Sequence, residues 1–354
     1  MGASLRKSTL HPGPQRRRPV QSKFGSGIVR CRPTGSALSG RDTMERGASC
    51  RFSVTILAKE RVLPPAVACI IPTHGRPDQL SRSLESVLRQ TAAPAEIVVV
   101  DDLDDERTAA VVRLTALRTE IPMRRIVNQA HPGASGSRNA GASANTAQFI
   151  AFLDDDDAWR PEHLARAMAE AQRTGADAVV SGLCRIRHDG TVQHIVMPSA
   201  LAVGGQLFDR NFGLTGSNLL IRRSAFERVG GFDPALPVFN DWDFAIRMIT
   251  KGIPYCVAPE LTVEWREHAG DRISTPTLRR ALGIEAFVFK HSAAMPPLNR
   301  RNLLADALGI RRRNARTLAE RIILAARLLR LLGLRESIGR RLRPQRRRTV
   351  EAEC

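Results

Sequence analysis

Acidic residues that directly follow two apolar segments are the groups in this sequence best suited to chemistry. Asp101 and Asp102 follow the segment 96–100 (EIVVV), and four aspartates, 154–157, follow the segment 148–153 (QFIAFL). Like charges packed together repel one another, and a bound cation relieves that repulsion. Carboxylate oxygens are the ligands that Mg²⁺ and Mn²⁺ prefer. The sequence therefore predicts a divalent metal site, for Mn²⁺ or Mg²⁺.

Asp154 and Asp156 lie two residues apart in this run of acids. In an extended chain, side chains two residues apart point to the same side, so both carboxylates can reach one ion. A single aspartate at a strand end is often only a turn residue, and an acidic run can be a solvated surface. The position of this run directly after an apolar strand argues against the surface alternative.

The elements that would position these acids alternate between short apolar runs and amphipathic segments. Strands are expected at 66–72, 96–100, 123–127, 148–153, 176–183 and 218–222, and helices at 78–90, 106–119, 135–145 and 161–174. This alternation predicts an α/β fold with a mixed, mostly parallel sheet and helices on both faces. Ligands of such sheets bind at the carboxyl ends of the strands, where the acids lie.

The charge of +19 is concentrated at the two ends of the 354-residue chain. Residues 1–63 carry a net charge of +10 and residues 299–354 one of +11, whereas 64–298 carry −2. We therefore expect a disordered basic N-terminal extension (1–63), a catalytic domain (64–298) and a basic C-terminal helical tail (299–354). A nucleic-acid partner is not expected, because the central domain has acids where a phosphate-binding groove needs bases.

The compartment predicted from the sequence is the cytoplasm. The six cysteines are scattered without zinc-ligand spacing, and no apolar run approaches the length of about 18 residues that a spanning helix needs. Residues 1–41 lack acids, as transit peptides do, but their prolines would break the helix that such a signal forms. A disordered extension, or a true start at Met44, is the alternative that we favour.

Five segments, taken together and in order, resemble the family 2 glycosyltransferases. They are 66–102 (with VLRQT at 87–91), 133–141 (GASGSRNAG), 152–159 (FLDDDDAW), 216–231 (GSNLLIRRSAFERVGG) and 240–244 (NDWDF). The resemblance implies the GT-A fold and metal-dependent, inverting transfer of a sugar from a nucleotide-sugar, by default a UDP-sugar, to an acceptor hydroxyl. It also implies a carbohydrate or lipid-linked acceptor, in the synthesis of cell-surface polysaccharide or glycolipid.

Two other classes of protein are weighed against this one. A sugar nucleotidyltransferase of similar fold would carry a glycine-rich, basic loop after the first strand, but the loop here (THGRPDQL) has one glycine and no lysine. A non-enzymatic binder of membrane or nucleic acid would account for the arginine-rich ends. It would leave the acid clusters unexplained.

The resemblance also implies roles for individual residues. Asp154 and Asp156 match the family's DxD element and would hold the divalent metal ion. Asp102 would accept a hydrogen bond from the nucleotide base, although the family usually continues with Gly-Ser where this chain has Leu103, Asp104 and Asp105. The predicted contacts to the nucleotide-sugar are Pro72, Thr73, Asp102, Arg138, Asn139, Asp155, Arg266 and His268. Arg138 could bind phosphate or order the acidic site, and a structural ion pair is its alternative.

Asp241 is the predicted general base, since the family usually has Glu-Asp where this chain has Asn240-Asp241. A carboxylate beside the acceptor takes the hydroxyl proton as the oxygen attacks the sugar. Asp243 is the competing candidate, with capping or bracing of the helix as its other role.

The tail contains an expected helix at 315–334 with an imperfect apolar face. Together with the arginines up to residue 348, it fits an anionic membrane on the inner face of the plasma membrane, to which the enzyme would bind peripherally. A helix packed on the core, followed by a disordered basic tail, remains the alternative.

Overall fold

The computed structural model of the chain describes residues 66–187, 189–199, 205–266 and 276–333. The predicted extension 1–63, the contact His268 and the end of the basic tail lie outside the described residues.

The first half of the catalytic region alternates strands and helices, as the apolar periodicity predicts. Its elements are β1 (Val67–Thr73), α1 (Pro77–Leu88), β2 (Glu96–Asp101), α2 (Glu106–Ala116), β3 (Met123–Val127), α3 (Ala134–Ser143) and β4 (Phe149–Phe152). The four strands are parallel and lie in the order β3-β2-β1-β4. This crossing-over brings the carboxyl ends of β1, β2 and β4 to one edge of the sheet.

The second half adds antiparallel partners to the same sheet. Its elements are β5 (Ala158–Trp159), α4 (His163–Thr174), β6 (Ala178–Ile186), β7 (Val192–Ile195), β8 (Leu219–Arg222), α5 (Arg223–Val229), α6 (Asn240–Thr250) and β9 (Tyr255–Arg266). The order continues from β4 through β8, β6 and β9 to β5, with β7 paired to β6. β8 is antiparallel to both β4 and β6, and β6 is parallel to β9.

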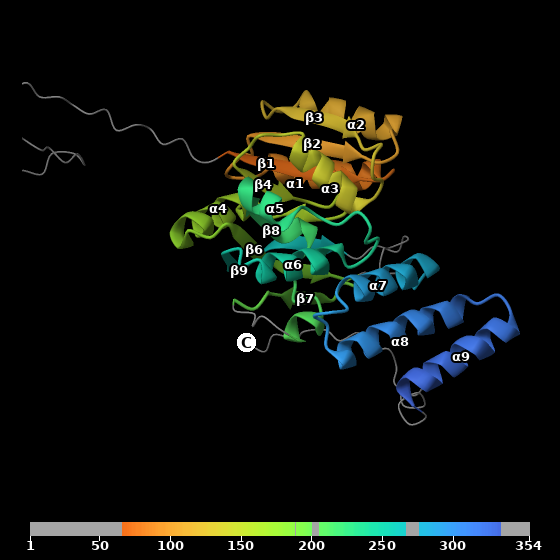
Figure 1. The fold of residues 1–354 in the computed structure, drawn as a ribbon. Helices are drawn as coiled ribbons and strands as arrows, with labels where there is room; N and C mark the ends of the chain where they lie inside the picture. Colours follow the sequence, from red (N-terminus) through yellow and green to blue (C-terminus); the bar gives the residue numbers. More distant parts are fainter. Residues whose placement is uncertain (1–65, 188, 200–204, 267–275, 334–354) are drawn as a thin grey trace, which may run out of the picture. The chain divides into compact units, whose positions relative to one another are not determined.

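Helices cover both faces of the sheet (Figure 1). Successive residues of β2 point to opposite faces of the sheet. Ile97 and Val99 pack in a core with side chains of α1 and α4. Val98 and Val100 pack in a second core with side chains of α5, α6 and α7. The central strands are buried on both faces and are therefore apolar throughout. The structure confirms the predicted mixed, mostly parallel α/β sheet.

α3 lies unusually close to the sheet because of Gly141. A Cβ atom at this position would lie 2.4 Å from Cγ2 of Ile70 in β1. A side chain there would push the helix outward, so the small residues of the segment 133–141 allow α3 to run directly along the site.

Three helices follow the sheet: α7 (Leu278–Lys290), α8 (Pro297–Asn314) and α9 (Leu318–Leu332). α7 contributes Ile284 and Phe287 to the core, α8 packs against α7, and α9 packs against α8 (Figure 1). A capping box of Thr317 and Glu320 begins α9. Among the described helices, none combines the length and hydropathy needed to cross a bilayer.

The predicted element boundaries agree with the structure to within a few residues. The strand predicted at 123–127 is β3. The predicted tail helix 315–334 corresponds to α9, which begins at Leu318 and ends at Leu332. The largest differences are at helix ends. For example, α2 stops at Ala116 rather than at residue 119, because apolar periodicity does not mark where a helix ends.

Candidate active site

Three carboxylates converge at the carboxyl edge of the sheet, directly after β4. Oxygens of Asp154, Asp156 and Asp157 all lie within 4.8 Å of one another. The side chains of Asp154 and Asp156 are 29% and 24% exposed, so both are accessible from solvent. The two predicted metal ligands are thus brought together, and Asp157 joins them.

Asp157 is the acid of this group that most clearly lacks a counter-charge. It is buried, and its Oδ2 accepts a 2.5 Å hydrogen bond from the Ser217 hydroxyl, whereas its Oδ1 has no hydrogen-bond partner within the described residues. Burial, and then the charges of Asp156 and Asp154, raise its pKa well above the usual range. A divalent cation would relieve both the repulsion and the unsatisfied oxygen, so the residues present fit a hard metal ion.

Ser217 joins the acid cluster to the second half of the sheet. It lies just before β8, donates to Asp157, and accepts a 3.0 Å hydrogen bond from the backbone N–H of Asp154. Its carbonyl accepts from the indole N–H of Trp159, which is buried and stacks on His163. Trp159 therefore packs against the acidic loop.

Asp155 points away from the other three acids into the protein. Its carboxylate accepts a 2.7 Å hydrogen bond from Thr73 at the end of β1 and lies 2.8 Å from a guanidinium nitrogen of Arg76. Burial raises its pKa to about 7, although the charge of Arg76 lowers it. Arg76 also contacts Asp156 at 3.2 Å. Thr73 and Asp155, both predicted donor contacts, thus bind each other.

Arg138 lies between the predicted metal site and the predicted base. Its buried guanidinium places Nη2 2.5 Å from Oδ1 of Asp154 and Nη1 3.4 Å from Oδ1 of Asp241. The group also stacks 5.0 Å from the ring centre of Phe232. A Cβ atom at Gly216 would lie 2.4 Å from this guanidinium, so glycine leaves the space that the arginine fills.

Asp241 is aimed at the site from the first turn of α6. Phe239, just before the helix, has a left-handed backbone (φ 61°), which costs energy for a residue with a side chain. Edge contacts with Trp242 and Phe287 hold it there. Burial raises the pKa of Asp241 to about 6, although Arg138 opposes the shift. A carboxylate with such a pKa is well matched to general-base catalysis near neutral pH.

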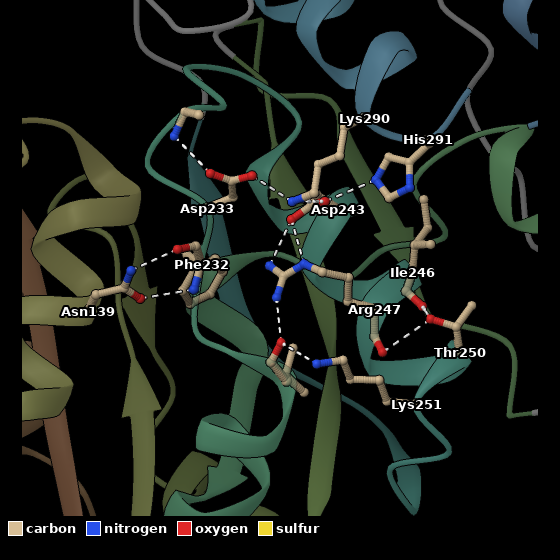
Figure 2. A network of polar contacts seen from close by, with 12 residues as sticks. Asn139, Phe232, Asp233, Asp243, Ile246, Arg247, Thr250, Lys251, Lys290 and His291 are labelled. Carbon is tan, nitrogen blue, oxygen red and sulfur yellow. Dashed lines mark hydrogen bonds and ion pairs between the residues drawn. The ribbon is translucent and has the colours of Figure 1, made fainter. Parts of the chain in front are cut away.

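Asp243 lies two residues further along the same helix, and its carboxylate is surrounded by the nitrogen atoms of three side chains (Figure 2). Its carboxylate lies 2.7 Å from Arg247, 2.8 Å from Lys290 and 2.9 Å from Nε2 of His291. Despite burial, hydrogen bonds from His291, Arg247 and Lys290 lower its pKa to about 2. Asp243 therefore braces α6 against the end of α7, which is the alternative role foreseen for it.

Asp102 is nearly buried and accepts hydrogen bonds at both oxygens. Oδ2 accepts from the backbone N–H of Gly133 at 2.7 Å, and Oδ1 accepts from Asn128 at 3.0 Å and from the Ser137 hydroxyl. It thus anchors the start of α3, where a carboxylate complements the helix dipole. Its predicted contact to a nucleotide base would have to share these oxygens.

The remaining predicted contacts are spread more widely. Pro72 is buried in β1. The side-chain amide of Asn139 is bonded at both ends to the backbone of Phe232, at 2.7 and 2.9 Å, and so holds the loop after α5 (Figure 2). Arg266, at the end of β9, is half-exposed and lies 2.6 Å from Glu264.

Sequence reasoning missed three contributors to the site. Arg76 and Ser217 contact the acids directly, and Asp157 was not among the predicted metal ligands although its carboxylate joins theirs. A buried acid in a four-aspartate run requires partners, and this requirement could have directed attention to Arg76. No local signal in the GSNLLIR segment, in contrast, indicates that Ser217 reaches residues 60 positions earlier.

A search of solved structures supports the fold. The Staphylococcus aureus TarS fragment 1–349, solved in complex with UDP-GlcNAc, superposes with a TM-score of 0.54 at 18% identity. The match covers 75% of this chain and 81% of that chain. At this identity, the likeness concerns the fold.

Two characterised relatives match part of the chain. The succinoglycan biosynthesis protein ExoO of Rhizobium meliloti is 33% identical over 208 residues, which are 55% of this chain and 59% of that protein. The Escherichia coli protein WfgD, a UDP-Glc:alpha-D-GlcNAc-diphosphoundecaprenol beta-1,3-glucosyltransferase, is 26% identical over 159 residues, 45% of this chain and 60% of WfgD. The chain thus spans about three-fifths of each relative.

Sheet topology, acid cluster and relatives together define a class: the protein is a nucleotide-sugar glycosyltransferase with a GT-A-like fold. Residues 68–230 match the family model described as glycosyl transferase family 2. The similarity to this family thus extends over the stretch from β1 to the end of α5.

Proposed function

We propose that the protein is an inverting, metal-dependent glycosyltransferase that moves a sugar from a UDP-sugar to the hydroxyl of a carbohydrate or lipid-linked acceptor. The observation that carries this proposal is the arrangement around Arg138. One buried guanidinium lies between Asp154, in the acid cluster, and Asp241, a separate carboxylate of raised pKa. A metal ligand on one side and a base on the other are what single displacement requires.

Asp154 and Asp156, with Asp157, would hold Mn²⁺ or Mg²⁺. When bound, such an ion offsets the negative charge that develops on the departing nucleoside diphosphate. Arg138 supplies a further positive charge at the same place, and Arg76, through Asp155 and Asp156, keeps the acidic loop in position. The acids are thus oriented by protein contacts before any ligand arrives.

Asp241 would take the proton of the acceptor hydroxyl while its oxygen attacks the anomeric carbon. Attack on the face opposite the leaving phosphate inverts the configuration at that carbon. Arg138 contacts Asp241 only at 3.4 Å, so the carboxylate retains an oxygen for the acceptor. The partly exposed side chain (25%) supports access from solvent.

The donor would lie along the carboxyl edge of the sheet. Pro72, Thr73 and Asp102 are proposed to face the nucleoside, and Arg138, Asn139, Asp155, Arg266 and His268 the remainder of the nucleotide-sugar. Leu103 stands where the family usually has glycine, and its side chain is 54% exposed. It lies close to Gly75, since a Cβ atom at Gly75 would be 3.0 Å from Cδ1 of Leu103. We therefore expect this protein to differ from members of the family in how it contacts the nucleotide base.

The acceptor class and location follow from the relatives and from the tail. One relative takes part in succinoglycan biosynthesis, and another uses a diphosphoundecaprenol acceptor. We therefore propose a role in cell-surface polysaccharide or glycolipid synthesis. The enzyme would act in the cytoplasm, peripherally bound to the inner face of the plasma membrane through residues 315–348.

The metal assignment is tested by nucleoside diphosphate release from a panel of nucleotide-sugars, with Mn²⁺ or with a chelator. We expect wild-type turnover with one donor only when metal is present, and loss of at least a hundredfold in Asp154→Ala and Asp156→Ala. Glu162→Ala, an exposed acid just after the cluster, is the matched control and should remain active. Full turnover of both cluster variants in chelator would refute the proposal.

A further inference from the structure

α9 presents an apolar face to solvent although its opposite face is packed. Leu324, Leu328 and Leu332 are half-buried or buried on the side where α9 packs against α8. Outside this packed side, Leu318, Ile322 and Leu329 form a stripe at helical spacing with exposed fractions of 73%, 60% and 40%, and Ile323, which is 54% exposed, lies beside the stripe. Apolar side chains that are gathered on one face in this way mark a binding surface.

Arginines surround this stripe. Arg312 and Arg313, at the end of α8, and Arg321 in α9 line an open depression with a volume of about 330 Å³. Arg327 and Arg330 lie further along α9 and are exposed. Within the described residues, none of these five arginines forms an ion pair with a carboxylate.

The acid of α9 does not offset this charge at the stripe. The Glu320 carboxylate accepts hydrogen bonds from the backbone N–H groups of Arg316 and Thr317, which closes the capping box. The Glu320 carboxylate is therefore engaged in capping the start of α9 and does not pair with any described arginine beside the stripe. The cap also means that α9 is formed before any partner binds, so binding does not have to supply the free energy of ordering it.

We infer that the outer face of the α8–α9 hairpin is a docking surface for an anionic phospholipid bilayer. Arg312, Arg313 and Arg321 bind lipid phosphates in the depression, while the stripe of Leu318, Ile322 and Leu329 enters the boundary between head groups and acyl chains. The inference rests on the peripheral location proposed for the enzyme and assigns it to specific side chains.

Charge complementarity favours a bilayer over a second copy of the chain. A symmetric dimer through this face would bring two sets of unpaired arginines together, which costs free energy. A bilayer supplies apolar volume and anionic charge in the same plane, at the depth that an amphipathic helix reaches.

The test is co-sedimentation of the full chain with vesicles, either phosphatidylcholine alone or phosphatidylcholine mixed with phosphatidylglycerol, at low and high salt. Wild type should bind the anionic vesicles, less so at high salt. Ile322→Glu combined with Leu329→Glu should weaken this binding at least tenfold, although every arginine of the chain remains. Arg312→Gln combined with Arg313→Gln should weaken it about fivefold per arginine.

Leu117→Glu is the matched control, because Leu117 is 84% exposed at the end of α2 and lies outside the proposed surface. It should bind vesicles as wild type does. Wild-type binding by the Ile322/Leu329 variant, or equal binding of wild type to neutral and anionic vesicles, would overturn the inference. So would a shift from dimer to monomer in that variant with unchanged vesicle binding.

Two readouts separate this inference from the enzymatic proposal. Nucleoside diphosphate release without vesicles should be unchanged in the Ile322/Leu329 variant, which also shows that the variant is folded. Asp154→Ala should bind vesicles normally even though its turnover is lost. A failure of either proposal therefore leaves the other open to its own test.

Discussion

At the scale of single residues, the site depends on how burial divides the roles of its carboxylates. Asp241 and Asp243 are two positions apart on α6, yet burial raises the pKa of the first to about 6, and hydrogen bonds from cationic side chains lower that of the second to about 2. One can therefore accept a proton near neutral pH, and the other remains an anion. Environment, rather than residue type, assigns the base.

Asp241→Asn is predicted to lower turnover about 10² to 10⁴-fold with little change in the KM of the donor, because the amide can still accept from Arg138 but cannot take a proton. Steady-state kinetics with a saturating acceptor measures this. Exposed Glu227, substituted by Gln, is the control. A raised donor KM at unchanged kcat would assign Asp241 to donor binding instead.

Wild-type turnover is predicted to fall as the pH drops through about 6, where Asp241 becomes protonated. The sign follows from the role, since a base works only in its deprotonated form. Turnover should therefore be complete above this pH and lost below it. A pH–rate profile for kcat/KM, which reports the ionisation of groups in the free enzyme, checks the prediction, and a profile without this acidic limb contradicts it.

Some residue roles could be predicted from the sequence, and others could not. The pairing of Asp154 with Asp156 is local, and it was predicted from their spacing together with the match to the family's DxD element. Asp102 and Asn139 were assigned to the donor, yet the structure shows both bonded to the protein's own backbone. These contacts join segments 31 and 93 residues apart, which no local pattern encodes.

At the scale of secondary-structure elements, α6 is held in place by the end of α7. Asp243 is completely buried and joins Arg247 of its own helix to Lys290 and His291 at the end of α7 (Figure 2). Asp241 lies half a turn away. The direction in which the predicted base points therefore depends on a contact between two helices that are 28 residues apart along the chain.

Asp243→Asn is predicted to reduce the free energy of unfolding by about 2 kcal/mol at pH 7, as expected from a pKa lowered from its usual range to about 2. Because the folded pKa lies below the unfolded one, this contribution is complete above about pH 4. It disappears as the pH falls through about 2. Urea unfolding of wild type and variant across this range measures the difference, which should close at low pH.

Asp233→Asn is the matched control for this comparison. Asp233 also contacts Lys290, at 2.6 Å, but its side chain is 25% exposed, so its loss should cost under about 1 kcal/mol. Equal destabilisation by the two variants would contradict the role given to burial.

The elements themselves were largely predictable, for a physical reason. Strands such as β2 and β4 are buried on both faces and must be apolar along their whole length, which a single sequence displays directly. The antiparallel insertion of β8 was not predicted. Strand order depends on which apolar runs meet in space, and Leu219–Arg222 has no feature that selects β4 as its neighbour.

At the scale of the whole molecule, a metal ion held by the acid cluster would link metal binding to folding. The carboxylates of the cluster repel one another in the native state and separate when the chain unfolds. An ion that binds only the folded form stabilises it in proportion to the logarithm of its concentration. The protein should therefore be measurably more stable with metal than without.

Mn²⁺ at about a hundred times its Kd is predicted to raise the melting temperature by roughly 5 to 10 °C, from a stabilisation of about 2.7 kcal/mol. Thermal unfolding with and without metal measures this shift. Asp154→Ala should abolish it, and Glu162→Ala should keep it. A shift of the same size in Asp154→Ala would mean that the ion binds elsewhere.

The hydrogen bonds of Ser217 also have a consequence for biosynthesis. The acids at 154–157 leave the ribosome some sixty residues before the hydroxyl that orients Asp157 and the strand that pairs with β4. A nascent chain that ends before β8 has the DDDD sequence but lacks its support. The candidate active site can therefore form only after β8 has been synthesised. An N-terminal fragment that ends before β8 would contain the four aspartates but not the contacts that orient them.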